Sequence, residues 1–189
     1  MDNERNWRFR LELTEQIGLM LHLFSAEDIR DHLGPIAFQL VQDKVAAVRK
    51  AAAVVVSTML CTLFKTEKEK YDARLASNIV KVLGQSTQWS RRQTFAVLCG
   101  EIVKNNQKEA SYSESKFGTE LLPQLLDLTW DKVPNVRIAV ARVLMQLGPE
   151  HYSNCKDLVD AAMAQLKQDK DVNVREETGE NISNLTQLH

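Results

Sequence analysis

The chain has 189 residues, of which 44% are hydrophobic and 26% are charged, and its formal net charge at pH 7 is −1. Basic and acidic residues are nearly equal in number, and the sequence contains no basic stripe. Both observations argue against nucleic acid as a partner, because phosphate binding requires concentrated lysine and arginine. Seven glycines and four prolines are few turn formers for this length, and their scarcity favours long helices over a β-sandwich or barrel.

Helical apolar periodicity recurs along the chain in pairs of segments. In chain order, helices are expected from about residue 7, over 26–42, from 48, over 72–83, from 89, over 117–130, from 136, over 154–168 and from 174. Polar linkers at 65–70 and 104–116 are expected to be solvated loops, and the second is rich in serine, so phosphorylation is an alternative role. The longest weakly polar run, 51–64, is too short to span a bilayer, so no membrane partner is expected.

A short motif marks the start of every second helix: an acidic residue, four residues, then an apolar residue followed by arginine. The copies are Asp2…Trp7-Arg8, Asp43…Val48-Arg49, Asp131…Val136-Arg137 and Asp169…Val174-Arg175, with a degenerate copy at Gly84…Trp89-Ser90-Arg91. The apolar residues at 7, 48, 89, 136 and 174 give steps of 41, 41, 47 and 38 residues, the length of a helical-pair repeat. We expect each aspartate to be the N-cap of its helix and each arginine to pair with the aspartate of a neighbouring repeat.

Two prolines, Pro35 and Pro123, each lie eight residues before a motif aspartate, where they should kink or start a helix. Proline, aspartate and then Val-Arg at this spacing resemble the signature of HEAT repeats. The predicted fold class is therefore all-α, an α-α superhelix (HEAT-repeat solenoid) of about nine helices. We expect one array over 1–189 with about four and a half repeats. Because Trp7 and Phe9 are apolar, unlike a polar capping repeat, we expect a C-terminal piece of a longer solenoid.

Motifs that carry chemistry are absent from the sequence. There is no HExxH, GxSxG, P-loop or GxGxxG pattern, and none of the four histidines pairs with cysteine or histidine at metal-ligand spacing. Cys61, Cys99 and Cys155 are far apart and are expected to be free thiols in a reducing compartment. We therefore expect no catalytic residue, no cofactor and no metal.

Two strings resemble scaffold and regulatory subunits of protein phosphatase 2A-like enzymes. They are Asn6-Trp-Arg-Phe-Arg-Leu-Glu-Leu13 and the stretch from Leu122 to Arg142, and the likeness runs from Asn6 to about Val174. The resemblance implies that the turns inside the repeats line one ridge, which holds a phosphatase catalytic subunit. Carried over by position, the partner-binding residues are Trp7, Arg8, Lys44, Val45, Ala46, Gln88, Trp89, Val133, Pro134, Asn135, Lys170 and Asp171. Ala46 occupies a position in the second turn where the family often has a large residue, so the resemblance implies a weaker contact there.

Two interpretations of Trp7 and Trp89 stay open at this stage. In the motif they occupy the position that valine holds in three other copies, which is usually core, so packing alone could explain them. A tryptophan is bulkier than that position requires, however, and its ring could extend into the turn as a binding anchor.

The resemblance implies a non-catalytic scaffold that binds a serine/threonine phosphatase catalytic subunit of the protein phosphatase 4 or 2A kind, with room for a further regulatory subunit. A HEAT adaptor of another class, such as a transport-linked solenoid, is the alternative, and a HEAT-fold enzyme is a third hypothesis. The Trp-Arg-x-Arg-Leu turn favours the first, because a general adaptor has no need of it. We expect a cytoplasmic protein, with a nuclear location left open.

Overall fold

The structure is a computed structural model that describes residues 6–66, 74–108, 116–148 and 155–179. Those residues form helices and turns and contain no strand, which confirms the all-α prediction for the described part of the chain. In chain order the elements are α1 (Trp7–Met20), η2 (Leu21–Leu23), α2 (Ala26–Asp28), η3 (Ile29–Leu33), α3 (Gly34–Leu40), α4 (Ala46–Thr66), α5 (Arg74–Ile79), η4 (Val80–Gly84), α6 (Trp89–Lys108), η5 (Phe117–Leu121), α8 (Leu122–Asp127), η6 (Leu128–Trp130), α9 (Pro134–Leu144), α10 (Lys156–Lys167) and α11 (Val172–Glu177).

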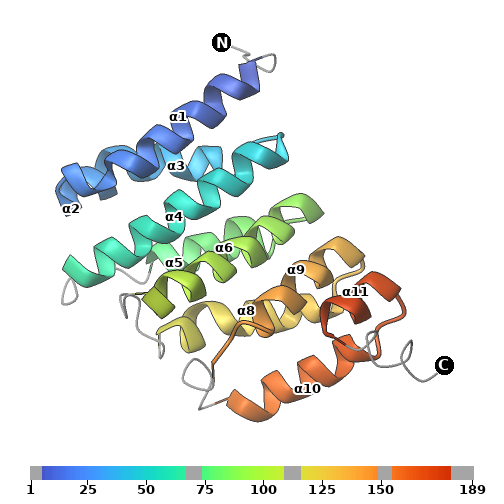
Figure 1. Ribbon diagram of the computed structural model, residues 1–189. Coiled ribbons are helices and arrows are strands. Elements are labelled where there is room, and N and C mark those ends of the chain that lie inside the picture. Colours follow the sequence, from blue (N-terminus) through green and yellow to red (C-terminus); the bar gives the residue numbers. More distant parts are fainter. Residues whose placement is uncertain (1–5, 67–73, 109–115, 149–154, 180–189) are drawn as a thin grey trace, which may run out of the picture.

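These elements combine into two layers of helices (Figure 1). The second helix of each repeat, which we call the B helix, is α1, α4, α6, α9 or α11, and each of these contacts the next one along the chain. The A helices are the composite segments α2–η3–α3, α5–η4 and η5–α8–η6, together with α10. Within the described residues this gives the nine helices that the repeat spacing predicted, in the arrangement of a HEAT-type solenoid.

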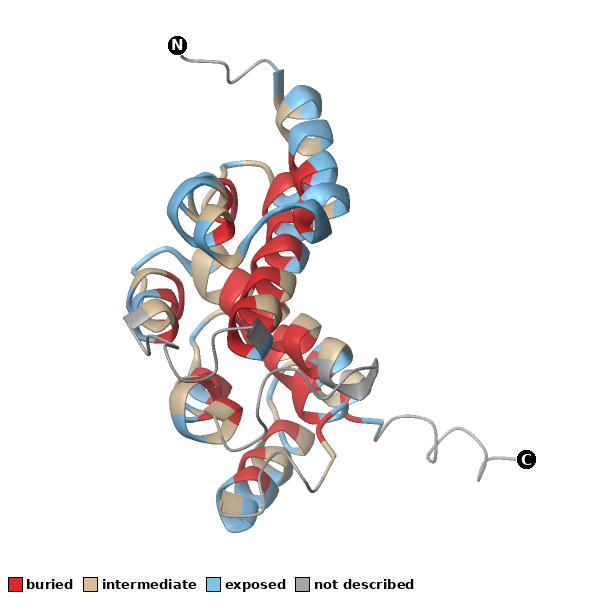
Figure 2. Ribbon diagram, turned by 90° about the vertical axis from the view of Figure 1, so that its left-hand side faces the viewer, coloured by how far each residue is buried: buried red, intermediate tan, exposed pale blue. Residues whose placement is uncertain are grey.

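The core lies between the two layers, where Figure 2 shows the buried residues concentrated. Ile79 and Leu125 from the A helices and Phe95 from α6 are fully buried. Apolar residues at helical spacing place one face of each helix against its neighbours, and removing that surface from water is the main force that holds the repeats together.

Helix α4 has the most apolar composition of the B helices. Among the described residues it is the one helix long and apolar enough to cross a membrane, with a mean hydropathy of 1.6 over Ala46–Lys65. The apolar run at 51–64 was expected to be too short for this, and that expectation of length is wrong, because the helix continues past both ends of the run. Since 67% of the apolar window is buried and α4 contacts both α1 and α6, it packs as a core helix.

Three of the A helices contain a five-residue π-helical turn, at Ile29–Leu33, Val80–Gly84 and Phe117–Leu121. Pro35 and Pro123 lie in the first turn of the α-helical segments that follow the first and third of these, as the proline spacing predicted. Proline has no N–H and its ring clashes with the carbonyl four residues earlier, so a widened turn before it accommodates both effects. The π-helical turn at Val80–Gly84 is not followed by a proline, so proline is not the general cause of these turns.

The predicted loops are shorter than expected. Helix α6 continues to Lys108, so the first five residues of the expected 104–116 loop are helical, and α4 likewise includes Lys65 and Thr66. Good helix-forming residues such as lysine and glutamine extend both helices beyond their apolar stripes. Residues 67–70 and the serines of 109–115, with the phosphorylation hypothesis attached to them, lie outside the described residues.

Candidate protein-binding ridge of the intra-repeat turns

Three of the four described turns between an A helix and its B helix are closed by the aspartate of the repeated motif. The carboxylate of Asp43 accepts a hydrogen bond from the Val45 amide at 2.8 Å, and that of Asp131 accepts from the Val133 amide at 2.9 Å. Asp169 does the same with the amide of Asp171 at 2.8 Å. These bonds form Asx turns ahead of the helix.

The prediction that the motif aspartates are the helix N-caps is wrong. In the two turns where the cap is resolved, the N-cap lies two residues further on, at Val133 for α9 and at Asp171 for α11. Val133 provides no side-chain cap, whereas Asp171 accepts from the Asn173 amide at 2.9 Å. The motif aspartate is needed instead for the turn itself and for the ion pair described next.

An arginine from the preceding B helix grips each motif aspartate through two hydrogen bonds. Arg137 donates from Nε to Asp169 Oδ2 at 2.6 Å and from Nη2 to Oδ1 at 2.8 Å. Arg10 binds Asp43 through the same atoms at 2.6 and 3.1 Å, and Arg92 binds Asp131 likewise. The predicted pairing of a motif arginine with the aspartate of a neighbouring repeat is confirmed for Arg137, while the other two pairs use Arg10 and Arg92. We call this row the Arg–Asp ladder.

The same arginines also stabilise their own turns. The Nη1 atom of Arg137 donates to the Asp131 carbonyl at 2.6 Å, and that of Arg175 donates to the Asp169 carbonyl at 2.6 Å. Arg49 and Arg92 donate to two carbonyls each in the corresponding turns. Each arginine thus fixes the geometry of one turn and links its repeat to the next.

Two of the ladder arginines differ from those that the sequence motif selected. Its arginines are Arg10, Arg49, Arg92, Arg137 and Arg175, in steps of 39, 43, 45 and 38 residues, so Arg8 and Arg91 are not part of it. Arg8 instead lies 4.7 Å from the centroid of the Trp7 ring, a cation–π contact. The third turn has Ser86 at the aspartate position, and Arg49 donates to Thr94 Oγ1 at 3.2 Å instead.

Burial and pairing oppose each other in the ladder carboxylates. Burial by itself would raise the pKa of Asp43, Asp131 and Asp169. The hydrogen bonds from the ladder arginines and the turn amides outweigh it, so the pKa of each carboxyl is held below its usual value. The ladder carboxylates are therefore ionised at neutral pH, and their charges are neutralised by the ladder arginines.

The residues predicted to bind a partner all lie in the turns or in the first turn of a B helix, next to the ladder. Figure 1 shows the start of each B helix on the same side of the molecule, so the start of α1 and the four described turns form one row. Exposed members are Arg8, Lys44, Ala46, Gln88, Trp89, Asn135 and Lys170, and half-buried members are Trp7, Val45, Val133, Pro134 and Asp171. We call these twelve residues the ridge.

The position of the two ridge tryptophans differs from the motif assignment. Trp7 and Trp89 are the first residues of α1 and α6, the place that Ala46 and Pro134 hold in α4 and α9. The buried valine position lies two residues later, where Val48 and Val136 are fully buried. Trp89 is 43% exposed, while Trp7 packs partly against the core, so the ring of Trp89 in particular is available at the ridge.

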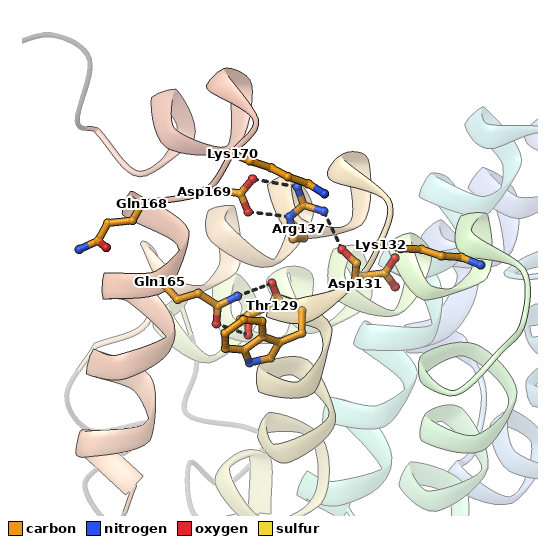
Figure 3. A pocket seen from close by; sticks show the side chains of 9 residues that line it. Thr129, Asp131, Lys132, Arg137, Gln165, Gln168, Asp169 and Lys170 are labelled. Carbon is orange, nitrogen blue, oxygen red and sulfur yellow. Dashed lines mark hydrogen bonds and ion pairs between the residues drawn. The ribbon is translucent and has the colours of Figure 1, made fainter.

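A groove beside the ridge was not predicted from the sequence. It has a volume of about 320 Å³ and is lined by Thr129, Trp130, Asp131, Lys132, Arg137, Gln165, Gln168, Asp169 and Lys170 (Figure 3). Gln165 donates to the Thr129 carbonyl at 2.9 Å, which joins the two A helices at the floor of the groove. Trp130 is 77% exposed, and sequence reasoning placed it only as the end of an A helix.

A second hollow of about 440 Å³ lies on the inner face of the B helices, between α4, α6 and α9. Its lining is mixed: Lys50, Gln93 and Arg142 stand beside Val97 and Ile138. Arg142 pairs with Glu177 of α11 at 2.8 Å, and Lys104 pairs with Glu101 at 2.7 Å, so part of its charge is already neutralised.

Groups able to perform metal or thiol chemistry are not brought together in the described ranges. No cluster of three or more His, Cys, Asp or Glu residues that could hold a metal ion occurs there. Cys61 and Cys99 are buried free thiols, and burial raises the pKa of the Cys99 thiol far above its ordinary value. A thiol that resists ionisation is a poor nucleophile, so Cys99 serves packing.

The two-layer helical pairs and the ladder that links them form an all-α solenoid. Residues 121–151, which contain the groove turn and α9, match the family model of the HEAT repeat.

The chain is similar to serine/threonine-protein phosphatase 4 regulatory subunit 1 of three mammals. It is 36% identical over 180 residues to the rat and mouse proteins and 35% identical to the human protein. Each match covers 92% of this chain but 18% of the relative, so the chain spans less than a fifth of the length of these curated relatives. The relatives agree with the phosphatase-subunit resemblance of the two sequence strings.

Proposed function

We propose that this chain is a non-catalytic regulatory subunit that binds a serine/threonine phosphatase catalytic subunit of the protein phosphatase 4 or 2A kind along the ridge. The observation that carries the proposal is the division of roles within each turn. The arginine and the aspartate, or Ser86 in the third turn, are engaged in holding the turn, while the residues beside them, such as Lys44, Trp89 and Asn135, remain exposed.

The chemistry of the ridge suits a protein partner. Tryptophan and arginine are the residues most enriched at binding hot spots, and Trp89 and Arg8 present them at two turns. The turns are fixed by the ladder before a partner arrives, so little conformational entropy is lost on binding. The similarity to relatives named as regulatory subunits of protein phosphatase 4 supports this choice of partner.

The direct test measures capture of purified catalytic subunits by the immobilised chain, using biolayer interferometry with the protein phosphatase 4 and protein phosphatase 2A catalytic subunits in separate runs. We expect Trp89→Ala and Arg8→Glu each to raise Kd by about tenfold, which corresponds to about 1.4 kcal/mol. Lys81→Glu serves as the charge control, because Lys81 is exposed on an A helix and is not one of the twelve ridge residues.

Melting temperature separates a contact from a packing role. Weakened capture with an unchanged melt supports the ridge. A lowered melt with undiminished capture at permissive temperature would return Trp89 to the core and leave the ridge without support. Absence of capture by both catalytic subunits would leave the adaptor class as the working assignment, with the partner sought by pull-down and mass spectrometry.

A cytoplasmic location and a further regulatory subunit belong to the same proposal. Both follow from the role as a phosphatase subunit, and neither depends on the geometry of the ridge. Fluorescence microscopy of the tagged chain tests the first. Size-exclusion chromatography of the complex recovered from cells tests the second, since a third subunit would give a mass above that of the pair.

A further inference from the structure

Among the four turns that the structure describes, the residue just before the turn differs in one repeat only. Gln42, Gln85 and Gln168 stand there in three turns, before Asp43, Ser86 and Asp169, whereas Trp130 stands there in the fourth, before Asp131. Gln42 shows what the position needs for folding, since its side chain donates to the Phe38 carbonyl at 2.7 Å and stays with its own helix. A glutamine therefore suffices for the turn, and the indole of Trp130 is not required by the repeat.

Trp130 also contributes little to the core. It is 77% exposed, the most exposed of the large hydrophobic residues in the described part of the chain. An apolar side chain left in water gains none of the free energy of burial, which for a side chain of this size amounts to a few kcal/mol. That gain becomes available when a partner covers the ring.

The positive charge of the lysines at the rim of the groove favours an acidic partner beside Trp130. Asp131 and Asp169 are held in bidentate ion pairs by Arg92 and Arg137. Lys132 and Lys170 are exposed at the rim of the groove, and within the described residues neither takes part in an ion pair, although the positive charge of Lys170 helps to lower the pKa of Asp169 (Figure 3). The groove of about 320 Å³ therefore has two exposed lysines and one exposed aromatic ring in its lining.

We propose that Trp130, Lys132 and Lys170 form an anchor site for an acidic segment of the phosphatase catalytic subunit. An apolar side chain of that segment covers the Trp130 ring, and carboxylates on either side of it bind the two lysines. This inference rests on the proposed function, and it extends the interface from the ridge into the groove between the fourth and fifth turns. Lysine–carboxylate pairs at such a rim speed association, while the covered ring slows dissociation.

The repeat itself supplies the sharpest variant, Trp130→Gln, which restores the residue found in the other turns. We expect an unchanged melting temperature and a Kd for the catalytic subunit of protein phosphatase 4 raised by about tenfold, mainly through faster dissociation. Leu158→Gln is the matched control, because Leu158 is 63% exposed on α10 and lies outside the groove.

The double variant Lys132→Glu/Lys170→Glu tests the charge. We expect slower association and a weaker dependence of the association rate on salt between 50 and 300 mM, as like charges replace attraction. Lys81→Glu should change neither quantity.

The outcomes separate this inference from the proposed function. If Trp130→Gln and the double charge variant capture the catalytic subunit as the unmodified chain does while Trp89→Ala does not, the groove is not an anchor and the ridge proposal stands. If none of these variants affects capture, both fail. A melting temperature lowered by several degrees in Trp130→Gln would make the tryptophan a packing residue and overturn the anchor.

Discussion

Arg137 and Asp169 form a bidentate ion pair between two repeats, with N–O distances of 2.6 and 2.8 Å and side chains that are 5% and 7% exposed. The same guanidinium donates to the carbonyl of Asp131 in its own turn. One side chain therefore holds a turn and a repeat boundary together, and its removal affects both.

Removing this arginine leaves a buried carboxylate without its cation. We expect Arg137→Met to lower the free energy of unfolding by about 3 kcal/mol, measured by urea denaturation, because breaking one side of a buried pair costs far more than an exposed pair contributes. Arg8→Met is the matched control, since Arg8 is exposed and outside the ladder, and it should cost less than about 1 kcal/mol. Equal effects of the two variants would contradict the structural role of the ladder.

The ladder also makes stability depend on pH. The pKa of Asp169 is lowered in the folded chain, since hydrogen bonds from Arg137 and the Asp171 amide outweigh the opposing effect of burial. A carboxyl whose folded pKa lies below its unfolded value of about 3.9 stabilises the fold above that pH, and the contribution is lost as the pH falls through the folded pKa.

We therefore expect the urea midpoint to fall steeply below about pH 4. Asp169→Asn should be less stable than the unmodified chain at pH 7, and the difference between them should narrow as the pH falls below 4. A difference that stays constant from pH 7 to pH 3 would show that the carboxylate charge is not what stabilises the repeat boundary.

The repeat architecture could be predicted because its signals are local. The proline at a fixed distance occurs in two repeats and the Val-Arg pair in three of the five, and apolar residues at helical spacing mark the helices between them. The motif selected the wrong arginine in the first copy, where Arg10 and not Arg8 binds Asp43, and in the degenerate third copy. In the third turn Ser86 replaces the aspartate, so the sequence motif was anchored on Gly84 and selected Arg91 in place of Arg92.

The site was predicted less completely than the fold. The resemblance placed the ridge in the turns, but the motif aligned Trp7 and Trp89 with the buried valines, whose position in fact lies two residues further on, so the core and anchor interpretations could not be separated. Trp130 was missed because it continues an apolar A helix. The signal was present in the sequence as the contrast with Gln42 and Gln168, but its meaning depends on exposure, which only the packed repeats determine.

The exposure of Trp89 predicts that its substitution destabilises the fold much less than substitution of a core residue. Trp89→Ala should shift the melting temperature by less than about 3 °C, because nearly half of the ring is already in water. Phe95→Ala, one and a half turns further along α6, removes a fully buried ring and should cost about 3 to 5 kcal/mol. Comparable shifts in the two variants would assign Trp89 to the core.

The ladder lacks an aspartate in the third turn, and supplying one there should strengthen it. Arg49 is buried and its Nε donates to the Thr94 hydroxyl, because the third turn has Ser86 where the other described turns have an aspartate. Burial lowers the pKa of Arg49, in contrast to Arg92 and Arg137, whose pKa is raised by a bound carboxylate. A carboxylate at position 86 would give Arg49 the partner that its neighbours have.

We therefore expect Ser86→Asp to raise the free energy of unfolding by about 1 to 2 kcal/mol, the usual contribution of a hydrogen bond to a charged group. The gain should vanish in an Arg49→Met background, and this double-mutant cycle isolates the new pair from any effect of aspartate on the turn itself. Ser77→Asp, on an exposed part of α5, controls for the added negative charge. A gain that persists without Arg49 would place the benefit in the turn, and a loss of stability would mean that the third turn cannot bring its carboxylate to the arginine.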